Sequence, residues 1–299
     1  MTSYRNDPAI CNSDINNLEK SEELFLKVRS GEYKTQVFQV MLDGTLAHCE
    51  ILTPEKFWDE YYIKEESLSP KQKEFVENLL AAKDKFVKIT PAIVEEVYKA
   101  VYTKPKEGDG MVLYNKLERH IKGLYSRKEG ITMAQKAAAE KRLKNVNENP
   151  EAKRLLELAN IREEEIFFEM YGVKCKSKID AHGIIEEERL TITVDLKIAK
   201  EPTSNEEVLK IIKDRKYDRQ TVFYDNAIKK SEEYNELYPG IKEFKSERYI
   251  IHVDPVKARV IKITDKTAEI KQKEIEKLVK RAGELCESEI PETNQILEV

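Results

Sequence analysis

TITVDLKIAK, residues 191–200, places two charged side chains within a run of otherwise apolar and β-branched residues. Its threonine, isoleucine and valine residues favour a β-strand. Successive side chains on a strand point to opposite faces, so Asp195 and Lys197 share one face while the apolar residues point the other way. A carboxylate and an ammonium group side by side on an otherwise apolar strand indicate either an ordinary ion pair or a chemical site.

Further strands are expected on both sides of this stretch. The run EEEIFFEMYGVKCKSKIDAHGIIEEERLTITVDLKIA predicts three consecutive strands, with turns near 170–172 and 186–189. A later pair, ERYIIHVDPVKARVIKIT, is expected to break at Asp254-Pro255. Helical patterns separate and follow these strands. The sequence therefore predicts an α/β fold, with a small mixed sheet flanked by helices.

The predicted secondary structure changes at Pro150, from mainly helical before it to mainly strands after it. Residues 64–145 are charged and helical in pattern, and two of their helices are expected to start at Ser69-Pro70 and Thr90-Pro91. The predicted strands all follow Pro150. We therefore expect a helical N-terminal part over residues 1–150 and a core that carries the chemistry over residues 151–299.

The composition argues against several classes of protein, among them membrane-spanning and disulfide-rich proteins. Of the 299 residues 36% are charged, yet the formal net charge is only −4. This balance argues against coating nucleic acid by bulk charge, although it leaves room for a local basic groove. There is no apolar run of about 18 residues and no signal-peptide pattern, so we expect a cytoplasmic protein without a membrane span. The four dispersed cysteines indicate reduced thiols rather than a zinc site or disulfide framework.

A second carboxylate accompanies the opening pair. We expect Asp180 to end the second strand, KCKSKID, and to approach Asp195 if the two strands form a hairpin. Two converging carboxylates suit a hard cation such as Mg²⁺. A lysine beside them could orient a nucleophilic water or stabilise negative charge on phosphorus. An ordinary salt bridge remains the alternative, because D…D-x-K alone is a weak motif.

Two helices carry further candidates. In YDRQTVFYDNA, Gln220 and Tyr224 lie four residues apart and share a helix face with Tyr217, where they could contact phosphate or water. The alternative is a buried tyrosine beside a surface glutamine. In LDGTLAHCE, His48 is either a core histidine or a metal ligand. Gly44, one turn earlier, would allow another backbone to approach closely.

The ordered set G-T-L-A-H, D, D-x-K and Q-x-x-x-Y resembles the PD-(D/E)XK nuclease superfamily. It is most like the RecE (exonuclease VIII) type and the related phage-borne RecB-like and lambda-exonuclease-like proteins. The stretches that carry the likeness are LDGTLAHCEILTPEKFWDEYY, YGVKCKSKIDAHGI, TVDLKIAK and YDRQTVFY. The likeness covers most of the chain and is weakest over residues 64–145. It implies a restriction-endonuclease-like core.

The resemblance assigns roles to the candidate residues. It implies that Asp180 and Asp195 are metal ligands, with His48 as a third ligand or a neighbour of the metal. It implies that Lys197 is the catalytic lysine. The expected cofactor is Mg²⁺, for which Mn²⁺ could substitute.

The remaining expected site residues lie on the neighbouring elements. The resemblance implies that Gln220 and Tyr224 support the substrate phosphate and the water. It also places a glutamate upstream of the first aspartate. Spacing favours Glu163 for this role, but Glu165 lies on the same strand face, and the choice among Glu163, Glu164 and Glu165 stays open.

The resemblance also implies an activity: a deoxyribonuclease, most specifically an exonuclease that resects double-stranded DNA for recombination and repair. The implied partners are DNA ends and a single-strand annealing protein, in a bacterium or a phage-infected cell. A homo-oligomeric ring around DNA is implied, with the basic stretches at 141–145 and 174–178 lining it. The alternatives are a structure-specific or restriction-like endonuclease and a catalytically silent DNA-binding protein.

Overall fold

The computed structural model describes residues 4–33, 39–85 and 89–288. The chain forms two compact units, one of residues 1–52 with 141–299 and one of residues 53–140. The second unit is therefore inserted within the first, whereas composition led us to expect a division at residue 150. The helices of the N-terminal half contribute to both units.

The first unit is built on a five-stranded mixed sheet in the order β3-β4-β5-β6-β7. Neighbouring strands are antiparallel, except that β5 and β6 are parallel. The mixed sheet, the three consecutive strands and the break at Asp254-Pro255 are confirmed. The strands are β3 (Ile161–Met170), β4 (Val173–Ile185), β5 (Leu190–Ile198), β6 (Lys245–Val253) and β7 (Ala258–Ile263).

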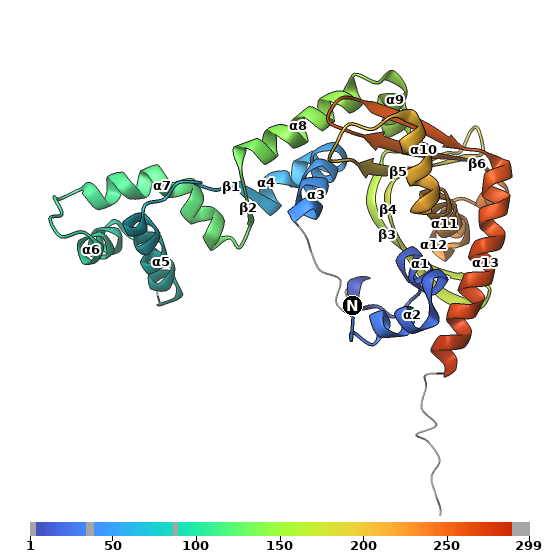
Figure 1. The fold of residues 1–299 in the computed structure, drawn as a ribbon, viewed down its shortest axis with the longest axis horizontal. Helices are drawn as coiled ribbons and strands as arrows, with labels where there is room; N and C mark the ends of the chain where they lie inside the picture. The colour runs from blue at the N-terminus through green and yellow to red at the C-terminus, as the bar shows by residue number, and fades with distance from the viewer. Residues whose placement is uncertain (1–3, 34–38, 86–88, 289–299) are drawn as a thin grey trace, which may run out of the picture. The chain divides into compact units, whose positions relative to one another are not determined.

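Helices pack around this sheet, as Figure 1 shows. No helix in the described ranges is long and apolar enough to cross a membrane. The helical elements that belong wholly or partly to this unit are η1 (Tyr4–Asn6), α1 (Asn12–Lys20), α2 (Glu22–Arg29), α3 (Gln39–Leu52), α8 (Met133–Asn147), α9 (Pro150–Leu158), α10 (Asn205–Asp214), α11 (Tyr217–Lys230), α12 (Glu232–Leu237), η3 (Ile241–Glu243) and α13 (Asp265–Ser288).

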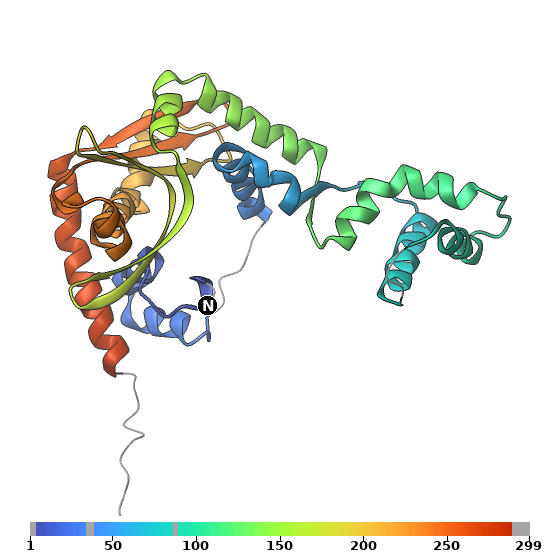
Figure 2. The ribbon, with the colours of Figure 1, turned by 180° about the vertical axis from the view of Figure 1, so that it is seen from behind.

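Two hydrophobic cores hold the layers together. The first joins β3 and β4 to α1, α11 and α13, with Phe168 and Phe223 packed edge to face at 5.5 Å. Figure 2 shows the long β3–β4 hairpin curving around α11 and α12. The second core joins β5 and β6 to α3 and α9, and includes Val194 and Leu196 of the opening stretch. The apolar residues of β5 are thus buried on the face predicted for them.

The turn between β6 and β7 is organised by one fully buried carboxylate, that of Asp254. It accepts hydrogen bonds from the backbone N–H groups of Val256 (2.7 Å), Lys257 (2.9 Å) and Thr203 (3.1 Å). The guanidinium group of Arg259 donates another at 2.7 Å. Although burial favours the protonated form, these donors hold the pKa of Asp254 well below its usual range.

We therefore expect Asp254→Asn to lower the free energy of unfolding at neutral pH by about 2–4 kcal/mol, because it leaves Arg259 without its buried partner. The native pKa lies below the unfolded value, so the carboxylate stabilises the fold above about pH 4 and loses this effect as the pH falls further. Urea denaturation at neutral and acidic pH measures both effects. Asp265→Asn, at an 89% exposed side chain paired with Arg248, is the matched control. An equal loss in both variants would contradict the assignment.

The second unit contains helices and a small parallel strand pair. The helix starts at Ser69-Pro70 and Thr90-Pro91 are confirmed, and Thr90 Oγ1 accepts from the N–H of Ile93. The pair of strands was not predicted. The elements are η2 (Pro54–Lys56), α4 (Phe57–Glu60), β1 (Tyr61–Ile63), α5 (Pro70–Lys85), α6 (Pro91–Val101), α7 (Asp109–Tyr125), β2 (Glu129–Ile131) and the start of α8. The core of α5, α6 and α7 consists of Phe75, Val76, Leu79, Val94, Val101, Leu117 and Ile121.

Candidate active site

Three acidic residues lie in one row across β3, β4 and β5. The pairs that flank Glu163 and Asp180 place these two opposite each other. The register between β4 and β5 ends at Ala181 and Val194, so Asp180 and Asp195 are the next residues along the two strands, and the charge of Asp180 acts on the Asp195 carboxyl. The expected approach of the two aspartates is confirmed, but Asp180 does not end its strand, because the ladder between β4 and β5 continues through the turn-proximal half of β4.

The hydrogen-bonded ladder between β4 and β5 stops at this row. Here the Asp180 side chain, rather than a backbone carbonyl, accepts the hydrogen bond from β5. The N–H of Leu196 donates to Oδ2 of Asp180 at 2.8 Å. In the rest of the ladder such groups bond to carbonyl oxygens of the facing strand. Asp180 is therefore fixed in position at the point where β4 and β5 cease to pair.

A cluster of candidate metal ligands forms around Asp180. His48, Glu163 and Asp180 each offer a ligand atom, and these atoms lie within 4.8 Å of one another. All three side chains are partly exposed. Two carboxylates and an imidazole, all reachable from solvent, are a donor set that suits a divalent cation such as Mn²⁺ or Mg²⁺.

His48 reaches this cluster from α3, whose Ile51 and Leu52 pack into the second core. The expected role of Gly44 is wrong. A Cβ atom added at Gly44 would meet no described heavy atom within 4 Å, so no other described segment brings its backbone close to this glycine. The packing of α3 through its apolar C-terminal turn, rather than a glycine contact, positions His48.

The glutamate left open by the sequence is distinguished by backbone conformation. Glu163 has φ of 52°, a left-handed value that is uncommon for a residue other than glycine. This residue joins His48 and Asp180, and it is also ion-paired with Lys178. Glu165 lies outside this ligand cluster. A strained backbone at a cluster of polar side chains is typical of functional sites.

Glu164 belongs to a separate network that sequence reasoning missed. Its Oε2 lies 2.6 Å from Nε2 of the fully buried His182 and accepts from the Tyr234 hydroxyl, also at 2.6 Å. Burial favours the protonated form of Glu164, but these two partners lower its pKa. The only hint in the sequence is that His182 follows Asp180 by two residues. The network anchors the residue next to Glu163.

The opening pair forms an ion pair inside the sheet. Lys197 Nζ donates to Oδ1 of the fully buried Asp195 at 2.7 Å and lies 4.5 Å from the centre of the Tyr217 ring. Burial raises the pKa of Asp195 to about 7; Lys197 opposes the rise and the charge of Asp180 adds to it. Oδ2 of Asp195 is buried without a hydrogen-bond partner among the described residues. The neighbouring Tyr224 hydroxyl also lowers the pKa of this carboxyl, so the hydroxyl lies close to Asp195.

The Q-x-x-x-Y helix also reaches the site. Nε2 of the half-buried Gln220 donates to the hydroxyl oxygen of the buried Tyr224 at 2.6 Å. Burial raises the pKa of Tyr224 well above its usual value, and the charges of Asp180 and Asp195 add to this effect. Tyr224 therefore remains a neutral hydroxyl beside the two aspartates.

The basic stretches that were expected to line a ring are partly structural. Lys176 is buried and donates to the backbone carbonyls of Tyr4 (2.7 Å) and Asp7 (2.6 Å). Arg142 is also buried and donates to the carbonyl of Ala199. The expectation is wrong for these two residues, because the side chains satisfy backbone acceptors inside the fold.

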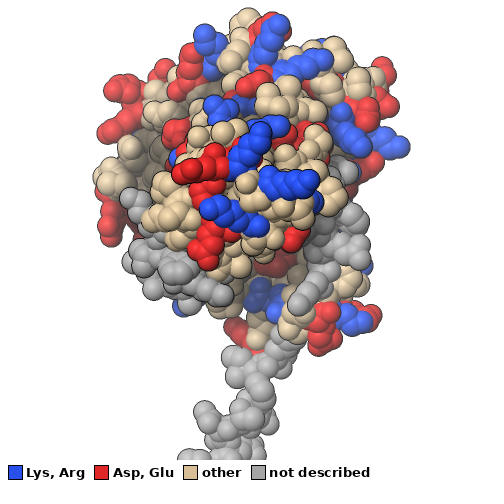
Figure 3. Space-filling model, turned by 90° about the vertical axis from the view of Figure 1, so that its left-hand side faces the viewer, with Lys and Arg blue, Asp and Glu red and all other residues tan. Residues whose placement is uncertain are grey.

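Charge is mixed on the surface as well as in the composition. On the face in Figure 3, lysine and arginine side chains are interspersed with aspartate and glutamate. Such a face produces no extended field of one sign. Any contact with a polyanion there depends on local groups of cations.

Comparison with known proteins identifies the family of the chain. A family model described as "PDDEXK-like domain of unknown function (DUF3799)" matches residues 11–293. Among solved structures, the chain is similar to the crystal structure of a putative exonuclease from Eubacterium rectale. The two are 15% identical, the match covers 79% of this chain and 96% of the other, and the TM-score is 0.41. No curated protein matches the chain.

Proposed function

Because the chain belongs to the family of PDDEXK-like domains of unknown function (DUF3799), we propose that it is a metal-dependent deoxyribonuclease, specifically an exonuclease that resects double-stranded DNA. The observation that carries the proposal is the convergence of His48, Glu163 and Asp180 beside the Asp195–Lys197 pair. These groups come from four elements, α3, β3, β4 and β5. Like-charged side chains on an ordinary solvated surface would repel one another rather than converge.

The residues present fit a divalent cation. His48, Glu163 and Asp180 would hold it, and the unsatisfied Oδ2 of Asp195 offers a further oxygen. When bound, such a cation lowers the pKa of a coordinated water and neutralises charge on a phosphodiester. Mg²⁺ and Mn²⁺ both accept carboxylate oxygen ligands, so Mn²⁺ is expected to substitute for Mg²⁺.

The chain's own groups would act on the phosphate as follows. The ammonium group of Lys197, held by Asp195, supplies positive charge where negative charge accumulates on phosphorus. Asp195 and Asp180 raise the pKa of Lys197 despite its burial, so the lysine stays charged. The Gln220 amide and the Tyr224 hydroxyl provide neutral hydrogen-bonding groups that orient the phosphate or the attacking water.

The finer parts of the proposal rest on the resemblance. They are end-dependent cleavage, a role in recombination and repair, a single-strand annealing partner and a homo-oligomer. Oligomerisation would have to present cations other than the buried Lys176 and Arg142 to DNA. Lys174 and Lys141 remain exposed in the same two stretches.

The test compares linear double-stranded DNA with a covalently closed circle, each incubated with the protein and Mg²⁺. We expect loss of the linear DNA alone, because an exonuclease needs an end, and no loss when a chelator removes the cation. Gel electrophoresis with release of acid-soluble nucleotides measures both reactions. Cleavage of the circle would favour the endonuclease alternative. DNA binding without degradation of either form would overturn the enzymatic proposal in favour of a silent binding protein.

A further inference from the structure

The second unit contains a cavity that the proposed chemistry does not use. Its volume is about 570 Å³, which is within the range of small-ligand and nucleotide sites. It opens between the short strand β1, the C-terminal half of α7 and the loop that leads to β2. Its lining combines aromatic and basic side chains: Trp58, Tyr61, Tyr62, Ile63, Arg119, Lys122, Gly123, Ser126 and Lys128.

Two aromatic rings are presented at this cavity. Trp58 is the single tryptophan of the chain and is 54% exposed. The Tyr62 ring lies directly against α7 at Gly123, where an added Cβ atom would lie 2.1 Å from Cγ of Tyr62. A glycine at this position is therefore required for the ring to approach the helix. An exposed indole beside a ring-lined cavity is typical of a binding surface.

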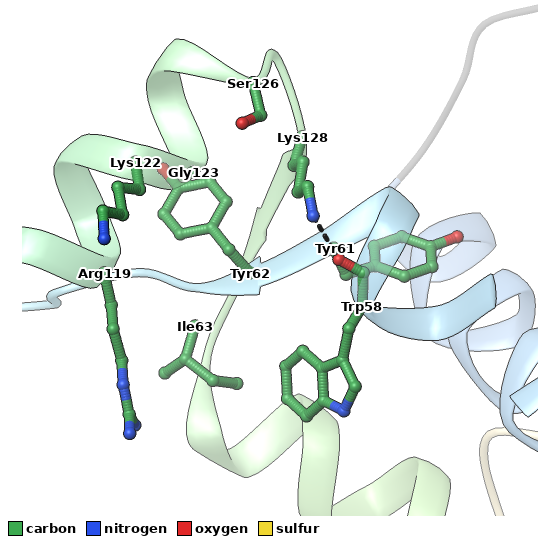
Figure 4. Close-up of a pocket in the computed structure, with 9 residues that line it drawn as sticks. All are labelled: Trp58, Tyr61, Tyr62, Ile63, Arg119, Lys122, Gly123, Ser126 and Lys128. Atoms are coloured by element: carbon green, nitrogen blue, oxygen red, sulfur yellow. Dashed lines mark hydrogen bonds between the residues drawn. The ribbon is translucent and has the colours of Figure 1, made fainter. Parts of the chain in front are cut away.

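Three cations surround these rings, as Figure 4 shows. The guanidinium group of Arg119 forms no ion pair or hydrogen bond with any residue that the structure describes, and Lys122 lies one helical turn further along α7. Lys122 pairs with Glu118 at 2.7 Å, but both side chains are exposed, so the pair is weak and readily exchanged. Lys128 donates to the backbone carbonyl of Trp58 and holds the indole-bearing turn in place.

We propose that this cavity binds single-stranded DNA. Flat aromatic surfaces bordered by cations are suited to bases joined by phosphates, since bases stack on the rings and the cations bind the backbone. Duplex DNA is a poor occupant, because its bases are stacked on one another and unavailable to a ring. The inference rests on the proposed function, since resection leaves a single strand that the enzyme must keep apart from the site.

Trp58 provides a direct signal, because no other tryptophan contributes to the emission. The full chain is titrated with oligodeoxythymidylate in the presence of a chelator, so that no cleavage occurs. We expect quenching of the Trp58 emission that saturates. Absence of quenching, with single-stranded DNA bound by other measures, would overturn the proposal.

Variants separate the stacking contribution from the phosphate contribution, with binding measured by anisotropy of labelled oligodeoxythymidylate. Trp58→Ala should weaken binding about tenfold through lost stacking, with little change in salt dependence. In the double variant Arg119→Ala with Lys122→Ala, the slope of log affinity against log salt should fall by about 0.7 for each cation. Lys99→Ala, at an exposed lysine on α6 in the same unit, is the matched control and should bind as the parent does.

Other results would contradict the proposal in distinct ways. Unchanged affinity and salt slope in the double variant would exclude this cavity as the strand site. Quenching by thymidine monophosphate at the same concentration as by the oligonucleotide would identify a small nucleotide as the ligand instead. If the quenching is as expected while linear DNA is not degraded, the catalytic proposal fails and the strand-binding proposal stands.

Discussion

Replacing Lys197 with alanine is expected to reduce the rate of DNA hydrolysis at least about 100-fold, which is typical for loss of one group that stabilises charge in the transition state. The substitution removes the ammonium group that lies 2.7 Å from Asp195. It leaves the carboxylates and the cavity of the second unit in place. Affinity for DNA, measured in a chelator, should therefore change little while turnover with Mg²⁺ is lost.

The controls for this variant address folding and position. Removing one partner of a buried ion pair usually destabilises a protein, although Asp195, with its pKa of about 7, can take up a proton when the lysine is absent. Thermal denaturation followed by circular dichroism checks that the variant is folded. Lys197→Gln is a second variant, which removes the charge but keeps a polar side chain. Lys262→Ala is the matched control, since Lys262 also lies on a strand of this sheet and pairs with a carboxylate, Glu247, at 2.6 Å. Full activity of a folded Lys197→Ala protein would contradict the role given to this residue.

Glu163→Gln is expected to weaken binding of Mn²⁺ by about 10- to 100-fold or more and to lower activity accordingly. The substitution retains the size of the side chain but removes the negative charge next to His48 and Asp180. Isothermal titration calorimetry with Mn²⁺ measures the affinity without reference to activity. The adjacent Glu165→Gln should leave affinity for Mn²⁺ unchanged, because Glu165 lies outside the ligand cluster.

Glu164→Gln provides a second comparison. This substitution should act through the His182 and Tyr234 contacts, so that it lowers thermal stability before it lowers affinity for the cation. Equal losses of Mn²⁺ affinity in the Glu163 and Glu165 variants would show that the cluster does not distinguish these residues. The assignment of Glu163 as the ligand would then be withdrawn.

The strand core of the protein could be predicted because strand alternation is a local property. The apolar residues of 191–198 alternate with Asp195 and Lys197, and the structure buries the two sets on opposite sides. The turns of the three-strand run also follow from local chemistry. A turn was predicted near 170–172, and Tyr171 and Gly172 there both have positive φ, as in a two-residue hairpin loop.

The sequence could not decide among the three glutamates, because the decision depends on a departure from alternation. A regular strand would place Glu163 and Glu165 on the same face, yet the left-handed backbone at Glu163 breaks the regular pattern there. The burial of Lys176 and Arg142 could not be predicted either. Their partners are backbone carbonyls far away in the sequence, and composition carries no information about such contacts.

The cavity of the second unit was missed for a related reason. No strand was predicted in FWDEYY, whereas Tyr61 begins a three-residue strand that pairs with Glu129. A strand this short has no detectable period, and its partner lies far along the chain. The one available signal was the single tryptophan next to two tyrosines in an otherwise charged region.

The left-handed backbone at Glu163 serves the ligand cluster at a cost to the stability of the fold. A side chain in this conformation costs about 1 kcal/mol that glycine would avoid, and its carboxylate lies beside that of Asp180, so like charges repel. Replacing Glu163 with glycine should thus remove a ligand from the site and raise the free energy of unfolding. A selection that rewarded thermal stability alone would therefore favour glycine over glutamate at this position.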